Sequence, residues 1–225
     1  MIGTRTLYRI RKAAEALAAE PGGQEDKQPT LTEQLETLAA QGAAPYQEIV
    51  RAGRAFWSGT TAAVAAVVAA PSTAHMFSIY NTEDDGGRSL VIDWVAALNV
   101  VSTAVASQAQ MILNVGQVRE AAPTNSAMTI KNMAGSGRVD SVARTLLTGT
   151  ALPATTGIAA NWFPWGQNGV KPGAAATPGY GMWAPVQGSC IVRPGRYFAM
   201  HVLANVVGET FVVFVGWHEK QLTLA

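Results

Sequence analysis

The spacing of apolar residues changes at about Ala55, and this change most constrains how the chain can fold. Before Ala55, apolar residues recur every three or four positions, as on one face of a helix. After it, valine, isoleucine, threonine and aromatic residues alternate with other residues in short runs, as strands require. The sequence of 225 residues therefore predicts a helical arm over residues 1–54 and a mainly β domain over residues 55–225. A domain of this size can bury a full hydrophobic core.

Two amphipathic helices are predicted within the arm. The first covers residues 4–20 and ends at Pro21-Gly22-Gly23, and the second begins at the capping box Thr30-Leu31-Thr32-Glu33 and ends near Gly42. Short amphipathic helices are marginally stable alone, so each needs a surface on which to lie. We expect the arm to dock on another surface through an apolar stripe that consists of Leu7, Ile10, Leu17, Leu31, Leu35 and Leu38.

The β domain shows its strands as two-residue alternation. A strand over residues 75–80 is followed by the Asp85-Gly86 dipeptide, which is typical of a tight hairpin turn. In the next strand Leu90, Ile92 and Trp94 are expected to share one face. These strands predict an antiparallel β-sandwich with apolar residues between its sheets.

The C-terminal strands show the pattern most clearly. Pro194-Gly195 predicts a turn before a strand over residues 197–204, and Gly208-Glu209 separates that strand from the last one, so a second hairpin is expected. Both faces of the last strand are apolar, which is typical of a strand in the middle of a sandwich or at a seam between subunits. We expect an oligomer interface to include Phe211, Val213, Val215 and Trp217.

Charged residues are distributed unevenly along the chain. Residues 55–225 carry nine basic and eight acidic side chains, whereas residues 1–54 carry seven of each. About a quarter of an ordinary soluble domain is charged, so the β domain is expected to cover its surface with other subunits. A net charge of +1 without a basic run argues against nucleic acid as a partner. The longest apolar run, residues 62–70, is too short to span a membrane. Charged residues interrupt the apolar residues near the N-terminus, so this segment does not resemble a signal peptide.

Residues 149–188 contain eight glycines and five prolines, and aromatic residues lie among them. We expect ordered loops here, inserted in the sandwich. Tryptophan rings bind sugars and are common at interaction hot spots, but the same rings also fill gaps beneath loops. The candidate ligand-binding residues, with packing as the favoured alternative, are Trp162, Phe163, Trp165, Tyr180 and Trp183.

The residue types of catalytic and metal sites do not form a known pattern. His75, His201 and His218 lack zinc-motif spacing, and a hydrogen-bonded histidine in the core or at a seam is the favoured interpretation. The single cysteine, Cys190, excludes an intrachain disulfide and is interpreted as a small buried apolar residue. Asp84-Asp85 lies in a predicted turn, where aspartate side chains commonly form hydrogen bonds with the backbone. We therefore expect no catalytic residues, no metal and no cofactor.

A resemblance rests on three segments of the β domain. They are His75-Met76-Phe77-Ser78-Ile79-Tyr80-Asn81, Gly87-Arg88-Ser89-Leu90-Val91-Ile92, and Val192-Arg193-Pro194-Gly195-Arg196-Tyr197-Phe198-Ala199-Met200-His201-Val202. With two preceding helices and a glycine-rich middle, the chain resembles the β-sandwich accessory proteins of tailed-bacteriophage virions. The resemblance covers about residues 55–221 and is one of general pattern, so it assigns no functional residues.

The resemblance implies a jelly-roll-like fold and a homotrimer. It implies a non-enzymatic virion structural protein, assembled in the host cytoplasm, that decorates the capsid or is a minor capsid protein. The helical arm would attach the trimer to a major capsid or tail protein. The alternative is a tail spike or fibre module in which loop aromatics bind a receptor or host glycan.

Overall fold

The computed structural model describes residues 45–103, 105–123, 129–135, 141–146, 151–153, 159–171 and 180–222. The chain divides into two compact units, residues 1–52 and 53–225. In the first unit the described part is α3 (Pro45–Arg51), a helix that the sequence pattern did not predict. The two predicted helices, and with them Leu7, Ile10, Leu17, Leu31, Leu35 and Leu38, lie outside the described residues. Within the described part of the chain, no helix has the length and apolar character needed to cross a membrane.

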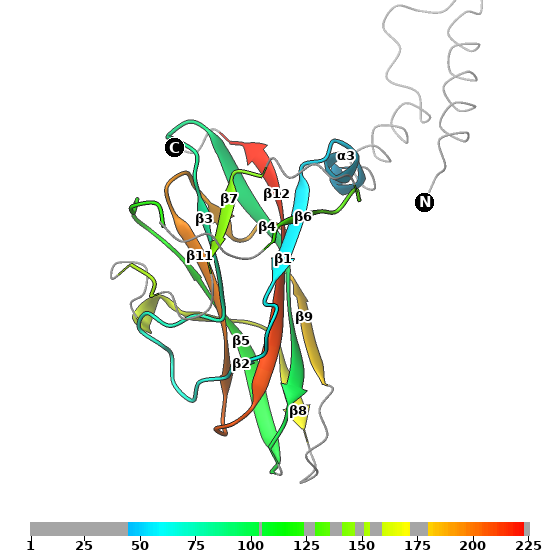
Figure 1. Ribbon diagram of the computed structural model, residues 1–225, viewed down its shortest axis with the longest axis vertical. Helices are drawn as coiled ribbons and strands as arrows, with labels where there is room; N and C mark the ends of the chain where they lie inside the picture. The colour runs from blue at the N-terminus through cyan, green and yellow to red at the C-terminus, as the bar shows by residue number, and fades with distance from the viewer. Residues whose placement is uncertain are drawn as a thin grey trace, which may run out of the picture. The chain divides into compact units, whose positions relative to one another are not determined.

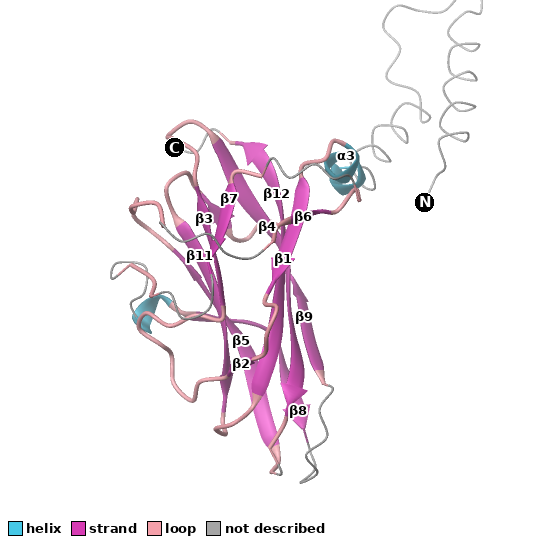
Figure 2. Ribbon diagram, viewed as in Figure 1, coloured by secondary structure: helices cyan, strands magenta, loops and turns pink. Residues whose placement is uncertain are grey.

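The second unit consists of two antiparallel sheets packed face to face (Figure 1; Figure 2). The first sheet has the order β10 (Ile191–Val192), β4 (Arg88–Val101), β12 (Thr210–Gln221), β1 (Ala55–Gly59) and β6 (Lys131–Asn132), with β2 (Val64–Ala65) beside β12 and β9 (Gly181–Pro185) beside β4. The second sheet has the order β7 (Ala143–Leu146), β3 (Phe77–Asn81), β11 (Tyr197–Ala204), β5 (Ser107–Val115) and β8 (Phe163–Lys171). A short 3-10 helix, η1 (Ala159–Asn161), precedes β8.

The order of the strands is that of a jelly roll. The first sheet contains the series β1, β12, β4, β9, and the second contains β3, β11, β5, β8. Along the chain, β1, β4, β9 and β12 of the first sheet therefore alternate with the strands of the second, except that β5 and β8 follow one another in the second sheet. This arrangement is a double Greek key, in which the first strand, β1, pairs with the last strand, β12. The predicted mainly β, jelly-roll-like sandwich is confirmed.

The core lies between the sheets and is built from alternate residues of each strand. Phe77 and Ile79 of β3 face it, as the period of two predicted, and are fully buried. Fully burying one such side chain stabilises the fold by roughly 1.5–3 kcal/mol. The largest fully buried core residues also include Phe56, Leu90, Ile92, Met111, Leu113, Phe198, Phe211 and Trp217.

The two predicted hairpins are wrong, because their strands belong to different sheets. β3 lies in the second sheet and β4 in the first, so the turn containing Asp85-Gly86 crosses between sheets. Likewise β11 pairs with β3 and β5, whereas β12 pairs with β4, β1 and β2. The physical reason is that the apolar faces of consecutive strands are buried against each other across the core. A hairpin within one sheet would place those faces side by side.

The prediction that residues 149–188 are loops is also wrong, since β8 and β9 lie in this segment. Both strands are at sheet edges, β8 beside β5 and β9 beside β4. An edge strand has one side free of ladder hydrogen bonds, so it tolerates proline such as Pro164 and Pro185. Gly166 adopts φ 75° within β8, near the register shift opposite β5.

A bulge in β4 changes the predicted face of one residue. Gly216 of β12 pairs with Trp94 and Trp217 pairs with Ile92, which leaves Asp93 as an extra residue. The alternation therefore slips by one position. Leu90 and Ile92 face the core as predicted, but Val95 faces it in place of Trp94.

The outer side of the second sheet is covered by segments of the same unit (Figure 2). Tyr80, Tyr197 and Ala199 point away from the main core and pack with Leu152 and half-buried Trp162. The Tyr80 hydroxyl donates to the Glu120 carbonyl at 3.0 Å. Tyr197 donates to the carbonyl of Ala121 at 3.1 Å, and burial raises the pKa of Tyr197 to about 12.

Candidate functional site

The outer side of the first sheet carries large apolar side chains that meet across neighbouring strands. Gly216 of β12 lies between Trp57 of β1 and Trp94 of β4. One row further along, Ala96 of β4 lies between Phe214 and Trp183 of β9. In the next row Val212 is opposite Leu98. We call this surface the aromatic platform and define it as Trp57, Trp94, Leu98, Trp183, Val212 and Phe214.

Two glycines let aromatic rings of the platform lie close to the sheet. A Cβ atom at Gly216 would collide with the Trp94 indole, and one at Gly59 would collide with the Phe214 ring. The rings therefore occupy the space that side chains at these two positions would fill. This pairing of glycine with a cross-strand aromatic ring is a known way to stabilise glycine in a sheet. It also holds the rings in fixed positions beside one another.

The platform is partly open to solvent. Trp183 is 63% exposed and Leu98 is 46% exposed. Trp57, Trp94, Val212 and Phe214 are half-buried. The rings of Trp57 and Phe214 are 6.2 Å apart, and the Lys131 ammonium lies 5.0 Å from the centre of the Trp57 ring. A cation at this distance from an indole is attracted by the ring quadrupole.

A polar pair lies beside the platform. His218 Nδ1 and Asp93 Oδ1 are 2.8 Å apart, and both side chains are mostly buried. Asp93 is the bulged residue of β4, and its carbonyl accepts hydrogen bonds from the backbone of Val186 and Gln187. The bulge thus fixes the loop after β9 and brings the Asp93 carboxylate to His218.

The aromatic residues predicted as a ligand site do not form one surface. Trp162 packs on the outer side of the second sheet, with its ring 6.4 Å from that of His201. Phe163 and Trp165 contact each other edge to face at 6.2 Å in β8. Tyr180 packs on Phe211 at 5.8 Å. Of the predicted residues, Trp183 alone belongs to the platform.

The residues predicted as an oligomer interface are core residues of a single chain. Phe211, Val213, Val215 and Trp217 are all 0% exposed and pack against the second sheet. The predicted interface role of these side chains is therefore wrong. β12 is apolar on both faces because it is central in the first sheet, with one face in the core and the other, through Val212 and Phe214, in the platform.

Two side chains of the residue types common in catalytic sites, His201 and Cys190, are buried in the second unit. His201 is 2% exposed, and burial lowers its pKa to about 4. Cys190 is buried, and burial raises the pKa of its thiol to about 11. Among the described residues there is no group of three or more histidine, cysteine, aspartate or glutamate side chains arranged to hold a metal ion.

Most of the platform does not follow from the sequence pattern. The alternation predicts Trp94 on the same face as Leu90 and Ile92, and it assigns no role to Trp57 or Phe214. The available signal is the two glycines inside strands, Gly59 and Gly216, each of which faces a large ring across a strand pair. This signal can be interpreted once the register of β1, β12 and β4 is known.

No protein-family model matches the chain, and no curated protein matches it.

Proposed function

We propose that the chain is a non-enzymatic structural subunit of a virion, which associates with copies of itself through the aromatic platform. The observation that carries the proposal is the exposed apolar surface on the outer side of the first sheet, next to rings held in fixed positions. Soluble monomers rarely expose a contiguous patch of this kind without a partner. Tryptophan and other aromatic residues contribute strongly to binding at the centres of interfaces.

The asymmetry between the two outer faces supports this proposal. Aromatic residues of the second sheet, such as Tyr80 and Tyr197, are covered by the unit itself, and their hydroxyls are hydrogen-bonded. The platform keeps Trp183 and Leu98 exposed instead. The few charged side chains of the second unit agree with burial against other subunits.

The virion part of the proposal rests on the resemblance and on compatibility of the fold. Jelly rolls occur in viral capsid proteins and in lectins, and one fold serves many functions. We propose a homotrimer that decorates the capsid or is a minor capsid protein, with the N-terminal arm bound to a major capsid or tail protein. Mass spectrometry of purified particles tests this part, because a virion subunit is present in them at a fixed stoichiometry. Its absence from intact particles would contradict it.

A matched pair of substitutions tests the association. Leu98 and Val118 are both 46% exposed, but Leu98 lies on the platform and Val118 follows β5. Leu98→Glu places a charge in the proposed interface and should convert the oligomer to a monomer, as measured by native mass spectrometry at micromolar concentration. Val118→Glu should leave the mass unchanged. A wild-type protein that is monomeric under these conditions would overturn the proposal.

A carbohydrate-binding function is the second candidate, and the exposure of Trp183 favours it. Sugar rings stack on exposed indoles, and Trp183 is 63% exposed beside the other platform rings. A glycan array distinguishes the two functions. Binding that is lost in Trp183→Ala but retained in the monomeric Leu98→Glu variant would favour a receptor-binding module.

A further inference from the structure

Two neighbouring cavities lie at the turn that joins β10 to β11. The first has a volume of about 500 Å³ and the second about 530 Å³. Arg193 and Arg196 line both of them. Volumes of this size are in the range of small-molecule sites. The cavities lie apart from the aromatic platform, since the residues that line them include none of its members.

The turn between the cavities fixes the two arginines close together. Arg193, Pro194, Gly195 and Arg196 form a β-turn, in which the Arg196 amide donates to the Arg193 carbonyl at 3.2 Å. Gly195 has φ 71°, as the third position of a type II turn requires, and Pro194 suits the second position. The first and fourth residues of a β-turn have Cα atoms less than about 7 Å apart. Two guanidinium-bearing residues are therefore brought together by the backbone.

Buried Asn81 holds this turn in place. Its carbonyl accepts from the Gly195 amide at 2.9 Å, and its amide donates to the Arg196 carbonyl at 3.0 Å. Its side-chain Nδ2 donates to the Val192 carbonyl at 3.0 Å. Asn81 is 0% exposed, so these bonds are shielded from water. A site whose backbone is fixed before binding loses little conformational entropy when the ligand arrives.

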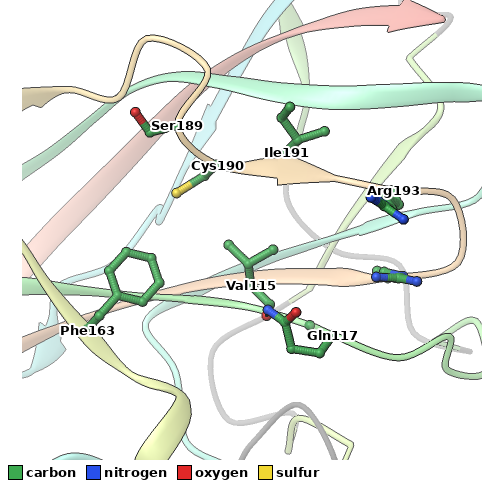
Figure 3. A pocket seen from close by; sticks show the side chains of 9 residues that line it. Val115, Gln117, Phe163, Ser189, Cys190, Ile191 and Arg193 are labelled. Atoms are coloured by element: carbon green, nitrogen blue, oxygen red, sulfur yellow. The ribbon is translucent and has the colours of Figure 1, made fainter. Parts of the chain in front are cut away.

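The lining of the first cavity combines positive charge with an apolar wall. Figure 3 shows Cys190, Ile191 and Arg193 on the β10 side, opposite Val115, Gln117 and Phe163 on the side of β5 and β8. Arginines supply its charge, and no acidic residue lines it. Guanidinium groups bind carboxylate, phosphate and sulfate oxygens through paired hydrogen bonds.

The acidic residue of the second cavity is already paired with another arginine. Asp85 lines that cavity and forms an ion pair of 2.8 Å with Arg119, which also binds Asp84 at 3.0 Å. The aliphatic part of Arg119 lies against the Cα of Gly195, where a Cβ atom would collide with it. Asp84 and Asp85 thus both bind Arg119.

From this geometry we propose that the first cavity binds a small organic oxyanion. Arg193 and Arg196 hold its carboxylate, phosphate or sulfate group, and Val115, Ile191 and Phe163 contact its apolar part. Gln117 is placed to bond a further polar group of the ligand. The site is independent of the self-association proposed above.

Isothermal titration at low ionic strength tests the site with three probes. Phenyl phosphate carries both the anion and a ring, inorganic phosphate carries the anion alone, and benzyl alcohol carries the ring without charge. We expect phenyl phosphate to bind about tenfold or more tightly than inorganic phosphate, and benzyl alcohol not to bind measurably. If phenyl phosphate and inorganic phosphate bound equally tightly, the cavity would bind only the anion, and the proposed apolar contact would be overturned. No binding of phenyl phosphate at millimolar concentration would overturn the site.

A matched pair of arginine substitutions locates the binding. Arg196→Gln should weaken phenyl phosphate binding about tenfold or more, because a charge-assisted hydrogen bond is lost. Arg54→Gln removes the same charge from an exposed arginine that lines neither cavity, and should leave the affinity unchanged. Equal loss in both variants would indicate non-specific attraction and contradict the site. Amide chemical shifts of Val192, Arg193, Gly195 and Arg196 should move on titration in the wild type, which also shows that the turn is folded.

Discussion

The buried position of His201 makes the stability of the protein depend on pH. The imidazole lies on the outer side of β11, near the edge of the Trp162 ring, and is 2% exposed. Its Nδ1 lies 2.9 Å from the amide nitrogen and 3.1 Å from the carbonyl oxygen of Val202. Burial disfavours the charged form, so the pKa falls from the usual 6.5 to about 4.

We predict that acidification destabilises the wild type more than a His201→Asn variant. Above pH 6.5 the imidazole is neutral in the folded and unfolded states, and its full contribution is present. As the pH falls from 6.5 towards 4, the unfolded chain binds a proton that the folded chain does not, so the free energy of unfolding decreases. The difference between the two proteins should change by roughly 2–3 kcal/mol between pH 7 and pH 4.5.

Chemical denaturation at these two pH values measures the change. Other titrating groups are common to both proteins and cancel in the comparison. A general loss of stability in the variant does not affect the test, because the pH dependence of the difference is the quantity compared. A difference that is constant with pH would contradict a neutral buried His201.

Single residues also show where a sequence pattern predicts the face of a strand correctly and where it does not. The two-residue period of a regular strand separates Phe198, Met200 and Val202 of β11, which face the core, from Tyr197 and His201, which face the outer side. The alternation in β4 failed at Trp94, because Asp93 is bulged opposite Gly216. A bulge depends on the partner strand, and a single strand's sequence does not specify it.

At the scale of elements, a buried polar cluster joins several strand ends. Glu209, just before β12, is 0% exposed and accepts hydrogen bonds from Ser107 at the start of β5 and from Tyr180 beside β9. Ser102, after β4, donates to Glu209 and accepts from the Lys171 ammonium at the end of β8. Burial is the main cause that raises the pKa of Tyr180, which keeps this hydroxyl a donor. The cluster therefore ties the ends of both sheets together.

We predict that Glu209→Ala destabilises the protein by about 3 kcal/mol, because the hydroxyl groups of Ser102, Ser107 and Tyr180 lose their common acceptor. Glu209→Gln keeps the size and one acceptor oxygen and should cost less. Asp84→Ala, at a side chain that is 98% exposed, should change the free energy of unfolding by less than about 0.5 kcal/mol. Urea denaturation at neutral pH compares the variants. Equal stability of Glu209→Ala and the wild type would show that the cluster does not hold the strand ends.

Strands were easier to predict than their pairing. The period of two identified β3, β4, β11 and β12, but local sequence does not determine which sheet a strand enters, and both predicted hairpins were wrong. β8 was missed because Pro164 and Gly166, which usually mark loops, are tolerated at a sheet edge.

At the scale of the whole molecule, exposed apolar residues lie beyond the core, but they are not the side chains predicted to form an oligomer interface. Phe211, Val213, Val215 and Trp217 fill the core, and the platform lies on the opposite side of the same sheet. The composition shows that apolar residues are abundant, but it does not show where they lie. The register of β1, β12, β4 and β9 determines which of these side chains are on the outer side of the sheet.

The kind of contact on the platform predicts how the proposed oligomer responds to salt. Its members are apolar, and Lys131 lies near one edge on the Trp57 ring. Association should therefore change by less than about threefold when sodium chloride is raised from about 0.05 to about 0.5 M, because exposed ion pairs contribute little to it. Sulfate should strengthen association, since it is excluded from apolar surface. Phenyl phosphate binding at Arg196 should weaken under the same increase in sodium chloride.

The melting temperature gives a second measure of the same association. A ligand that binds only the folded state stabilises it by mass action, and a second copy of the chain acts in the same way. The melting temperature of the wild type should therefore rise with protein concentration, whereas that of Leu98→Glu should not. A wild-type melting temperature that is independent of concentration, or an association that sodium chloride abolishes, would show that the platform is not the contact between copies.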